Sequence, residues 1–410
     1  MPGQPRLLLA DCDQMFVAVA RLVDPDGAGK APLLVVGGTI ESRGVVCSAS
    51  YEVRAFGVRS GMSIAQAARL CPRATFVPVP RHACGKKSRE VAAVLDEWAP
   101  RVEAASIDEF YLDLSGTEAV YRNAPLEATA RQIRGDVLRR TGMTLSIGGG
   151  TNRLVAKLAA ERAKPRPGSG GTGVLIVDPG QEGEFLATHQ LAEIPGVGPR
   201  LTAKLRTFGL VSVRDALPVA QRDFERWLGP RTGAWLFDRV RGRAGAGVEP
   251  AGEAKSMSRE ETFARDLSTD ADLEAQLLRL TTRLAAELRA EGLRARCLTL
   301  KLRDFDFSTR QASRTLPEPI DTDRATFAVA RELLAGLRRK RRVPARLIGV
   351  GFTRFESAEA SAQLSLLDPA GSTTARDRAV SAAVDRVNAK FGRDALQPAR
   401  LSGSPRRRRS

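Results

Sequence analysis

The chain has 410 residues, 43% hydrophobic and 27% charged, which predicts a globular protein of about two to four domains. No apolar run approaches the ~20 residues that span a membrane and no signal peptide opens the chain, which indicates a cytoplasmic protein without a membrane partner. The net charge of +17 favours a polyanionic partner, nucleic acid before an anionic membrane, and five scattered cysteines argue against a disulfide framework or a structural zinc site.

Strands and helices alternate along the first 165 residues. Short apolar or alternating runs predict the strands, and apolar spacing of three to four residues predicts the helices. Strands are predicted at 7–10, 33–36, 45–47, within 102–114 (two strands joined by a tight turn at 106–109) and at 144–147, and helices at 64–70, 89–98, 125–140 and 152–163. Such alternation predicts an α/β layer.

The second half of the chain predicts two further units. Residues 190–242 are predicted to be all-helical, and the Gly- and Ala-rich segment 243–252 is a predicted linker. A second α/β unit follows, with strands at 297–302 and 346–352 and helices near 271–291 and 323–339. Beyond Glu356 lie a polar stretch, a predicted helix at about 374–391 and a basic end.

Acids stand at the ends of two predicted strands. Asp11 and Asp13 follow the first strand, and Asp108 and Glu109 lie in the tight turn. Adjacent carboxylates repel one another unless a cation neutralises them. With only two histidines in the chain, metal chemistry would rest on carboxylates, which select hard ions such as Mg²⁺. Acids that merely cap strands remain the alternative.

Candidate phosphate ligands are spread over two segments. Ser48, Tyr51 and Arg54 fall within one short segment, and Lys164 follows a predicted helix. A triphosphate needs cations and hydroxyl donors, and arginine can bind it with two hydrogen bonds. On spacing alone, ordinary solvated side chains explain these residues better.

A hairpin of small residues, Ile194–Pro199, lies between two predicted helices. Gly196 and Gly198 would let backbone amides approach a phosphate closely, as in the helix–hairpin–helix pattern of sequence-independent DNA binding. A plain turn between helices is the alternative. The basic run 338–342 could line a duplex backbone, and the arginines at 406–409 would form an electrostatic tail; a solvated face is the alternative for both.

Taken together and in order, these motifs resemble those of the Y-family DNA polymerases, in particular the DNA polymerase IV branch. The resemblance covers about residues 6–355. The residues that carry it are Asp11-Cys-Asp-Gln-Met-Phe16, Ala49–Val58, Ser106–Asp113, Ser146–Asn152 with Ala163–Pro165, Pro195–Gly198 and Lys255-Ser256.

The resemblance implies a multidomain fold of α/β and α+β type, arranged as a right-hand polymerase. The expected domains are a palm (1–13 and 79–170), small fingers (14–78), a helical thumb with the helix–hairpin–helix (171–242), a linker (243–252), a little finger (253–357) and a tail (358–410).

The resemblance also implies roles for single residues. Asp11, Asp108 and Glu109 match the family's catalytic ligands of two Mg²⁺ ions, for which Mn²⁺ is a possible substitute, and the main-chain carbonyl of Cys12 would complete a metal shell. Asp13 matches an acid beside the site, with a supporting role.

Further matches concern the substrates. Phe16 matches the steric gate, whose ring occupies the space of a ribose 2′-hydroxyl. Ser48, Tyr51, Arg54 and Lys164 match the triphosphate contacts. The residues expected to contact DNA are Gly196, Gly198, Lys255, Arg339 and Arg341.

The chain departs from the family at three places. Met15 stands where an aromatic residue usually packs under the incoming nucleotide, so that sugar positioning could be looser. The segment 81–86 lacks a usual Tyr, and Arg259 replaces a His found in many relatives.

The tail carries a peptide that resembles the clamp-binding motif of bacterial polymerases. Its anchors would dock on the sliding clamp, the beta subunit, with Leu in place of the commoner Phe at the last position. These anchors are Gln363, Leu364, Leu366 and Leu367.

The function implied is template-directed, error-prone translesion synthesis, in which a monomer adds deoxynucleoside triphosphates to primer–template DNA without proofreading. One alternative is an inactive polymerase-like adaptor that bridges DNA, clamp and repair partners. Another is a phosphate-handling enzyme with a related palm, such as a nucleotidyl cyclase. Retention of all three acids favours the polymerase over the adaptor, and the hairpin and basic residues favour it over the cyclase.

Overall fold

The computed structural model describes residues 5–166, 168–245, 247–249, 252, 254–357, 375–392 and 395–401. The chain divides into two compact units, residues 1–252 and 253–410. Two sheets lie in the first unit and one in the second. Across the described ranges, no helix combines the length and apolar character that a membrane span requires.

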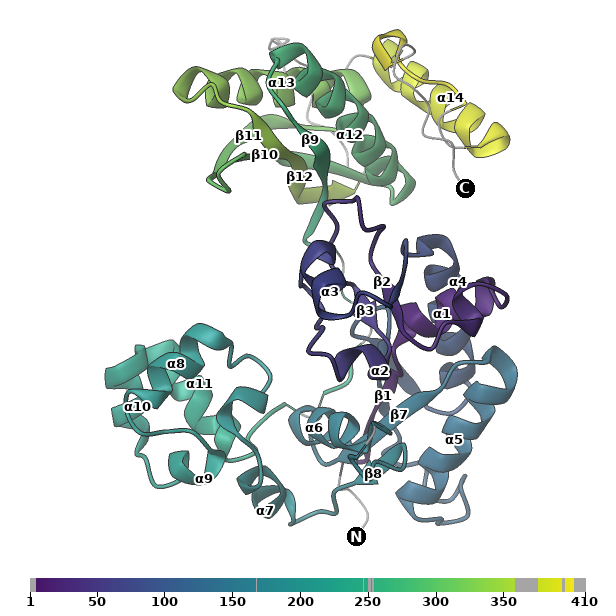
Figure 1. Ribbon diagram of the computed structural model, residues 1–410, viewed down its shortest axis with the longest axis vertical. Helices are drawn as coiled ribbons and strands as arrows, with labels where there is room; N and C mark the ends of the chain where they lie inside the picture. Colours follow the sequence, from purple (N-terminus) through teal and green to yellow (C-terminus); the bar gives the residue numbers. More distant parts are fainter. Residues whose placement is uncertain are drawn as a thin grey trace. The chain divides into compact units, whose positions relative to one another are not determined.

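A five-stranded sheet forms the centre of the first unit, with β1 (Leu7–Cys12) in its middle. Successive side chains of β1 point to opposite faces. Leu8 and Ala10 pack toward α4 (Arg81–Asp96) and α5 (Leu126–Thr141), while Leu7 and Leu9 pack toward α6 (Arg153–Ala163). In Figure 1, α6 lies on one side of β1 and β7, and α4 and α5 lie on the other. The strand order is β5 (Arg101–Ala104), β6 (Glu109–Asp113), β1, β7 (Leu145–Gly150) and β8 (Val174–Ile176).

A run of glycines lets α6 lie directly against this sheet. The strand predicted at 144–147 continues through Gly148, Gly149 and Gly150 as β7. A Cβ on Gly148 would lie 1.9 Å from the backbone N of Ala160 and 2.2 Å from the carbonyl O of Ala156. Only glycine therefore permits this approach, which sets the position of every side chain on α6.

A smaller three-stranded sheet packs its own core in the first unit. Its strands are β3 (Ser48–Ala49), β2 (Leu34–Val36) and β4 (Thr75–Val77), and its neighbours are α1 (Met15–Val23), η1 (Ala28–Lys30), α2 (Tyr51–Arg54) and α3 (Ile64–Leu70). The prediction of a strand at 45–47 is wrong, since Val45 makes only an isolated β-bridge to Ser63. Of that apolar run, Val46 alone is buried.

The predicted all-helical segment is confirmed. Its elements are η2 (Leu191–Glu193), α8 (Pro199–Arg206), α9 (Val213–Ala216), α10 (Gln221–Leu228) and α11 (Pro230–Val240), and α7 (Glu182–Ala187) comes just before it. They pack around the fully buried Leu205, Phe224 and Leu236. The predicted linker is pinned where it is described. Val248 is buried against β1, and the Glu249 N–H donates to Glu103 Oε2 at 3.0 Å.

The second unit is a four-stranded antiparallel sheet covered by α12 (Asp270–Ala290) and α13 (Asp323–Lys340). The order is β11 (Thr309–Ile320), β10 (Leu293–Asp304), β12 (Ala345–Ser357) and β9 (Ser256–Leu267). Strands β10 and β12 were predicted and β9 and β11 were not. On β9 the positions facing the helices include Arg259 and Glu261, which pair with Glu287 and Arg279 of α12, so the expected apolar alternation is missing.

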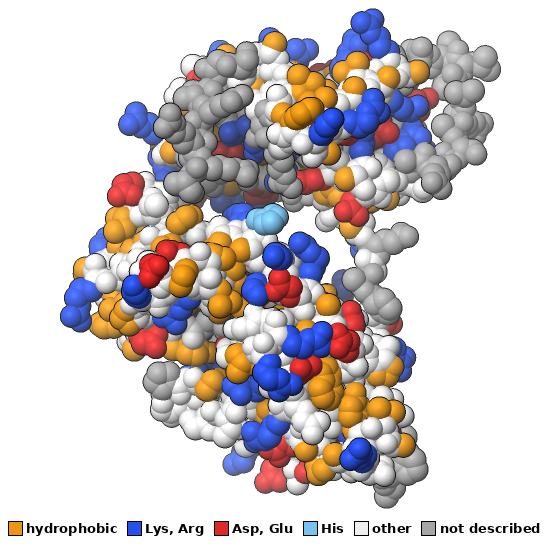
Figure 2. Space-filling model, turned by 90° about the vertical axis from the view of Figure 1, so that its right-hand side faces the viewer, with side chains coloured by type: hydrophobic (Ala, Val, Ile, Leu, Met, Phe, Trp, Pro, Cys, Tyr) orange, Lys and Arg blue, Asp and Glu red, His pale blue; other side chains and the backbone are white. Residues whose placement is uncertain are grey.

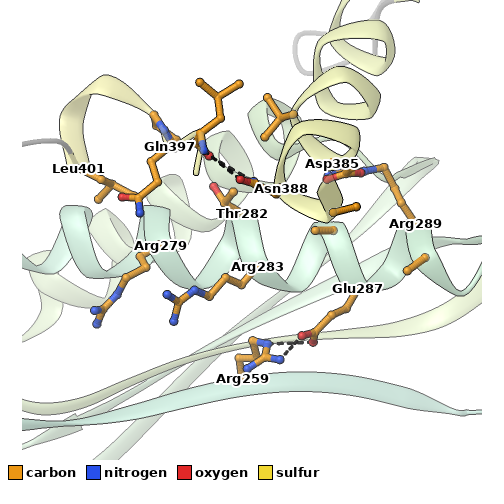
Figure 3. A pocket seen from close by; sticks show the side chains of 16 residues that line it. Arg259, Arg279, Thr282, Arg283, Glu287, Arg289, Asp385, Asn388, Gln397 and Leu401 are labelled. Carbon is orange, nitrogen blue, oxygen red and sulfur yellow. Dashed lines mark hydrogen bonds and ion pairs between the residues drawn. The ribbon is translucent and has the colours of Figure 1, made fainter. Parts of the chain in front are cut away.

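The predicted C-terminal helix forms as α14 (Ala375–Phe391), which contacts α12 and α13 and is followed by η3 (Ala399–Leu401). The Arg289 guanidinium contacts Asp385 at 2.7 and 2.8 Å and Asp323 at 2.9 Å. Beside this contact lies a cavity of about 500 Å³. In Figure 3, Asp385 reaches toward Arg289 and Glu287 toward Arg259. Arginine at 259 thus ties β9 to α12.

The close packing at Gly148 predicts a strong effect of one methyl group. Gly148→Ala should lower the free energy of unfolding by about 3 kcal/mol, because backbone atoms of α6 would have to move. The matched change Gly135→Ala lies in the middle of α5, where the nearest atom is the Arg139 side chain at 3.6 Å. It should raise stability by about 0.8 kcal/mol through helix propensity. Denaturant titration of both variants measures the two effects; equal stabilities would contradict the packing.

Candidate active site

The predicted acids converge at one edge of the central sheet. Strands β1 and β6 are antiparallel, and Asp11 lies directly opposite Glu109. The Cys12 N–H donates to the carbonyl O of Asp108 at 2.8 Å, which fixes the turn before β6. Residues far apart in the sequence therefore meet because two strands pair in this register.

Each of the three carboxylates has a partner. Lys164 Nζ lies 2.8 Å from Asp11 Oδ2, and Lys157 Nζ lies 2.8 Å from Glu109 Oε1. The Ser106 hydroxyl donates to Asp108 Oδ1 at 2.5 Å. No three Asp, Glu, His or Cys side chains in the described part of the chain are gathered closely enough to hold a metal ion. The acids thus share one edge of the sheet, but they do not form a closed ligand cage.

The carboxylates nevertheless influence one another. Burial raises the pKa of Asp11 to about 6; the ammonium of Lys164 opposes this rise, and the charges of Glu109 and Asp108 add to it. Burial by itself would lower the pKa of Lys164, but Asp11 and Glu161 outweigh it and raise that pKa. At neutral pH Asp11 and Lys164 are both ionised. The ammonium groups of Lys164 and Lys157 balance the negative charge of the neighbouring carboxylates.

The donor set fits hard divalent cations. Carboxylate and carbonyl oxygens are the ligands that Mg²⁺ prefers. Asp13 is buried beside them; its Oδ1 accepts a hydrogen bond from the Ser146 hydroxyl at 2.7 Å, and its buried Oδ2 has no hydrogen-bond partner within the described residues. Divalent cations could take the place of the ammonium groups of Lys157 and Lys164, which contact Glu109 and Asp11 in this structure.

Arg54, beside the ring of Tyr51, forms a basic patch with Arg166, a residue that sequence reasoning did not single out. The Arg54 guanidinium lies 5.1 Å from the Tyr51 ring centroid, and its Nε donates to the carbonyl O of Ala49 at 2.9 Å. Burial lowers the pKa of Arg54, and the nearby charge of Arg166 lowers it further. Arg166 also forms an ion pair with Glu161. Three cationic groups, Arg54, Arg166 and Lys164, thus belong to one neighbourhood.

Sequence reasoning missed Lys157 and Glu161 as well as Arg166. Lys157, Glu161 and Lys164 follow one another at intervals of four and three residues, which places them on one side of α6 and its end. The other side of α6 is apolar, with Val155, Ala159 and other buried residues. This pattern was the available signal.

The remaining predicted residues lie around the start of α1 and β3. Phe16 is half-buried between the cores of the two sheets, while Met15 is fully buried in the larger core. Gln14 adopts a left-handed conformation with φ 48°, and its Oε1 accepts the Tyr51 N–H at 3.1 Å. Ser48 is buried in β3. Met15 is therefore a core residue, and Phe16 is the residue that supplies an aromatic ring at the start of α1.

A cavity of about 600 Å³ joins the acids to the predicted hairpin. Asp11, Glu109 and Lys157 contribute to its lining, together with Pro195 and Gly196. Gly196 has φ +100°, and a Cβ there would lie 2.6 Å from the Trp235 ring, so the turn requires glycine. The cavity gives an extended anionic ligand room beside the acids.

The basic residues of the second unit divide into two groups. Lys255 and Arg339 are exposed. Arg341 instead binds Asp304 at 2.9 Å and Asp306 at 2.7 Å, and the buried Arg338 binds Asp270 at 2.6 Å. Figure 2 shows Lys and Arg side chains scattered among acidic ones on the face drawn. The clamp-binding anchors at 363–367 lie outside the described residues.

Known proteins resemble both parts of the chain. Residues 10–161 match the impB/mucB/samB family, and residues 254–366 match the impB/mucB/samB family C-terminal domain. The DNA polymerase IV of Dehalococcoides mccartyi (strain CBDB1) is 34% identical over 400 residues, covering 96% of this chain and 97% of that protein. The DNA polymerase IV of Streptomyces coelicolor is 35% identical over 352 residues, covering 86% and 71%.

Solved structures agree with these relatives. A Y-family DNA polymerase chimera superimposes with a TM-score of 0.73 at 25% identity, covering 85% of this chain and 98% of its own. DinB from Sulfolobus solfataricus gives a TM-score of 0.56 at 25% identity with the same coverage. The fold is thus that of a right-hand polymerase, with mixed α/β sheets and a little-finger domain. The chain belongs to the Y-family DNA polymerases, on the DNA polymerase IV branch, and is a DNA-directed DNA polymerase.

Proposed function

We propose that the chain is an error-prone translesion DNA polymerase that extends a primer 3′-hydroxyl at a two-cation site and lacks proofreading. The observation that carries this proposal is the pairing of Asp11 with Glu109 across β1 and β6, with Asp108 in the adjoining turn. Among the neighbours, the insertion ternary complex of Dbh DNA polymerase, with a TM-score of 0.59 at 25% identity, suggests that primer–template DNA and a nucleotide are the ligands.

Asp11, Asp108 and Glu109 would supply the carboxylate oxygens of this site, and Cys12 its carbonyl. Two Mg²⁺ or Mn²⁺ ions bound there would polarise the primer hydroxyl and balance the charge of the triphosphate. For this, Glu109 must release Lys157, which contacts both of its oxygens, whereas Ser106 engages only one oxygen of Asp108. Burial raises the pKa of Asp11, and the charges of Glu109 and Asp108 raise it further. The same negative charge is what two divalent cations would neutralise.

The lysines and arginines would then bind the triphosphate. Lys164 is the C-cap residue of α6, and Arg166 follows two residues later. Arg54 approaches from α2 and is partly desolvated. A guanidinium group can bind phosphate oxygens with two parallel hydrogen bonds. Tyr51 and Ser48 would contribute hydroxyl groups, and the phosphates would replace Asp11 and Glu161 as partners of Lys164.

The remaining parts would position the DNA. Backbone amides around Gly196 and Gly198 would contact phosphates of the primer–template duplex, as would the exposed Lys255 and Arg339. Arg341 is a weaker candidate than the sequence indicated, because two carboxylates already engage its guanidinium. The fingers, built on a three-stranded sheet of short strands, would press lightly on a nascent base pair, which suits distorted templates.

Loss of one carboxylate should stop the chemistry and spare DNA binding. Asp108→Asn should slow single-nucleotide insertion about a thousandfold, since it removes charge from the cation site. The matched control Asp96→Asn changes an exposed acid at the end of α4 and should leave the rate unchanged. Insertion is measured by single-turnover primer extension and binding by fluorescence anisotropy.

Two outcomes would count against this assignment. Near wild-type insertion by Asp108→Asn would show that the acids are not cation ligands. Absence of insertion by the wild-type chain, with DNA binding intact, would favour the adaptor.

Phe16 should select the sugar. Phe16→Ala should raise ribonucleotide insertion relative to deoxyribonucleotide insertion about a hundredfold, because the ring no longer excludes a 2′-hydroxyl. Leu22→Ala removes an exposed apolar side chain from the same helix and is the control. Competition between the two nucleotides on one primer–template measures the ratio, and an unchanged ratio would remove Phe16 from this role.

The clamp-binding peptide should act only when the clamp is present. Leu366→Ala combined with Leu367→Ala should abolish clamp-stimulated synthesis and leave basal primer extension intact, because docking depends on burial of the two apolar anchors. Ser365→Ala, within the same peptide, should have no effect. Equal loss of both activities would indicate misfolding instead of lost docking.

A further inference from the structure

The tip of the β10–β11 hairpin carries an aromatic residue at an unfavourable position. The Asp304 N–H donates to the Ser308 carbonyl at 2.8 Å, so residues 305–307 form a three-residue loop. Phe307 adopts φ 65°, the left-handed conformation that such loops usually assign to glycine. Its side chain is 64% exposed. Neither local conformational preference nor burial explains a phenylalanine here.

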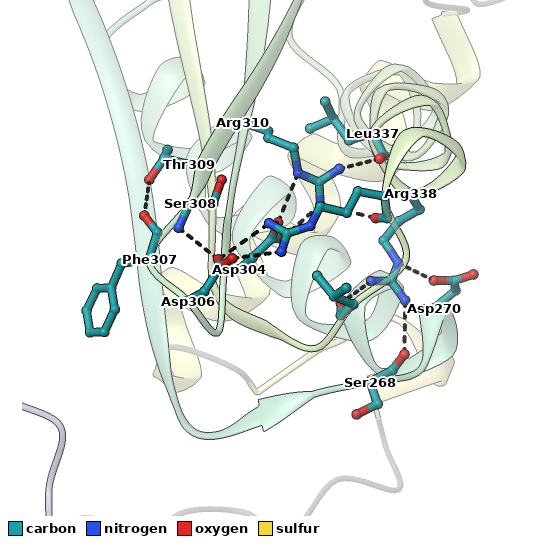
Figure 4. A network of polar contacts seen from close by, with 12 residues as sticks. Ser268, Asp270, Asp304, Asp306, Phe307, Ser308, Thr309, Arg310, Leu337 and Arg338 are labelled. Atoms are coloured by element: carbon teal, nitrogen blue, oxygen red, sulfur yellow. Dashed lines mark hydrogen bonds and ion pairs between the residues drawn. The ribbon is translucent and has the colours of Figure 1, made fainter.

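A network of ion pairs and hydrogen bonds holds the tip. Asp304 is fully buried and accepts from Arg310 at 2.8 Å and from Arg341 at 2.9 Å. The Asp306 carboxylate accepts the Ser308 N–H at 3.0 Å, and the Phe305 N–H donates to the Pro344 carbonyl at 3.0 Å. Figure 4 shows the Phe307 ring pointing away from this network. The ring is thus exposed to solvent on a backbone that is held by hydrogen bonds.

A second irregularity brings a cation to the ring. On β12, Leu347 pairs with Arg303 and Ala345 pairs with Asp304, so Arg346 is an extra, bulged residue. Bulges redirect side chains. The Arg346 guanidinium lies 4.7 Å from the Phe307 ring centroid, within cation–π range. No carboxylate among the described residues forms an ion pair with Arg346.

We propose that Phe307, with Arg346, is a stacking platform for an unpaired base of single-stranded DNA, such as the template beyond the primer end. An exposed aromatic ring beside uncompensated arginine is the combination with which proteins bind single strands. Arg303, whose Nε donates to Thr309, adds positive charge from β10. An apolar protein partner would have to desolvate these charges without compensation, whereas phosphates neutralise them.

This inference rests on the proposed function for its choice of DNA, but its test does not need catalysis. The full-length chain is titrated, in EDTA and without nucleotides, against a labelled primer–template with a long 5′ overhang and against a blunt duplex. Phe307→Gly should weaken overhang binding about tenfold and leave blunt-duplex binding unchanged, because one base–aromatic contact is lost. Unchanged overhang binding would overturn the platform.

Further variants separate stacking from other contacts. Phe307→Trp should retain overhang binding and Phe307→Leu should lose it; full binding by the leucine variant would indicate a plain apolar contact and overturn the proposal. Phe391→Ala is the matched control, since Phe391 is 68% exposed and has Lys390 Nζ 5.3 Å from its ring centroid. It should bind like the wild type, and a loss equal to that of Phe307→Gly would overturn the assignment.

Thermal unfolding and binding to an abasic overhang test whether a loss of affinity in Phe307→Gly comes from lost base stacking. Glycine suits the left-handed conformation, so Phe307→Gly should unfold at the same temperature as the wild type or above it. The wild type should bind an overhang of abasic sites about tenfold more weakly than an overhang of normal nucleotides, whereas Phe307→Gly should bind the two overhangs almost equally. Equal losses of affinity in the wild type and in Phe307→Gly would overturn stacking. If the wild type fails to extend primers, the proposed function fails while these binding differences stand.

Discussion

The pairing of β1 with β6 imposes the constraint on which the first unit depends. Their antiparallel register sets Asp11 opposite Glu109 at the ends of two inner strands of the sheet, with Asp108 in the turn. Like charges at opposite positions on neighbouring strands are destabilising. The protein balances them with Lys157 and Lys164. The negative charge that the lysines balance in this structure would also attract divalent cations. The stability of this part of the fold and the proposed chemistry therefore depend on the same carboxylates.

Helix α6 links that charge to the fold. It can supply both lysines only because Gly148 lets its backbone lie against β7. One face of the helix is buried with the sheet, and the other carries Lys157 and Glu161 and ends at Lys164. A displacement of α6 would therefore disturb the hydrophobic core and the cationic groups together. The cavity between α6 and the Gly196 hairpin extends this arrangement toward the helical segment that would hold DNA.

Arginine has a different use in the second unit. Arg310 and Arg341 satisfy the buried Asp304, and Arg289 ties α14 and α13 to α12 through Asp385 and Asp323. Part of the positive charge of the chain is therefore structural and unavailable to a polyanion. This distinction matters for nucleic-acid binding, because the arginines without carboxylate partners, such as Arg346, are the ones that a phosphate backbone or a base can recruit.

The sequence by itself determined the alternation of strands and helices, the acids at strand ends, the Pro195–Gly198 hairpin and the likeness to a polymerase family. These features are local: they follow from side-chain periodicity, capping residues such as Asn152 and short motifs. Strands β9 and β11 escaped prediction because Arg259 and Glu261 occupy inward positions on β9 and prolines interrupt β11, an edge strand. Only the tertiary structure decided that Lys157 meets Glu109, that Arg341 meets Asp304 and that Arg166 joins Arg54. Such pairings depend on which elements come to lie side by side, and no spacing along one segment encodes them.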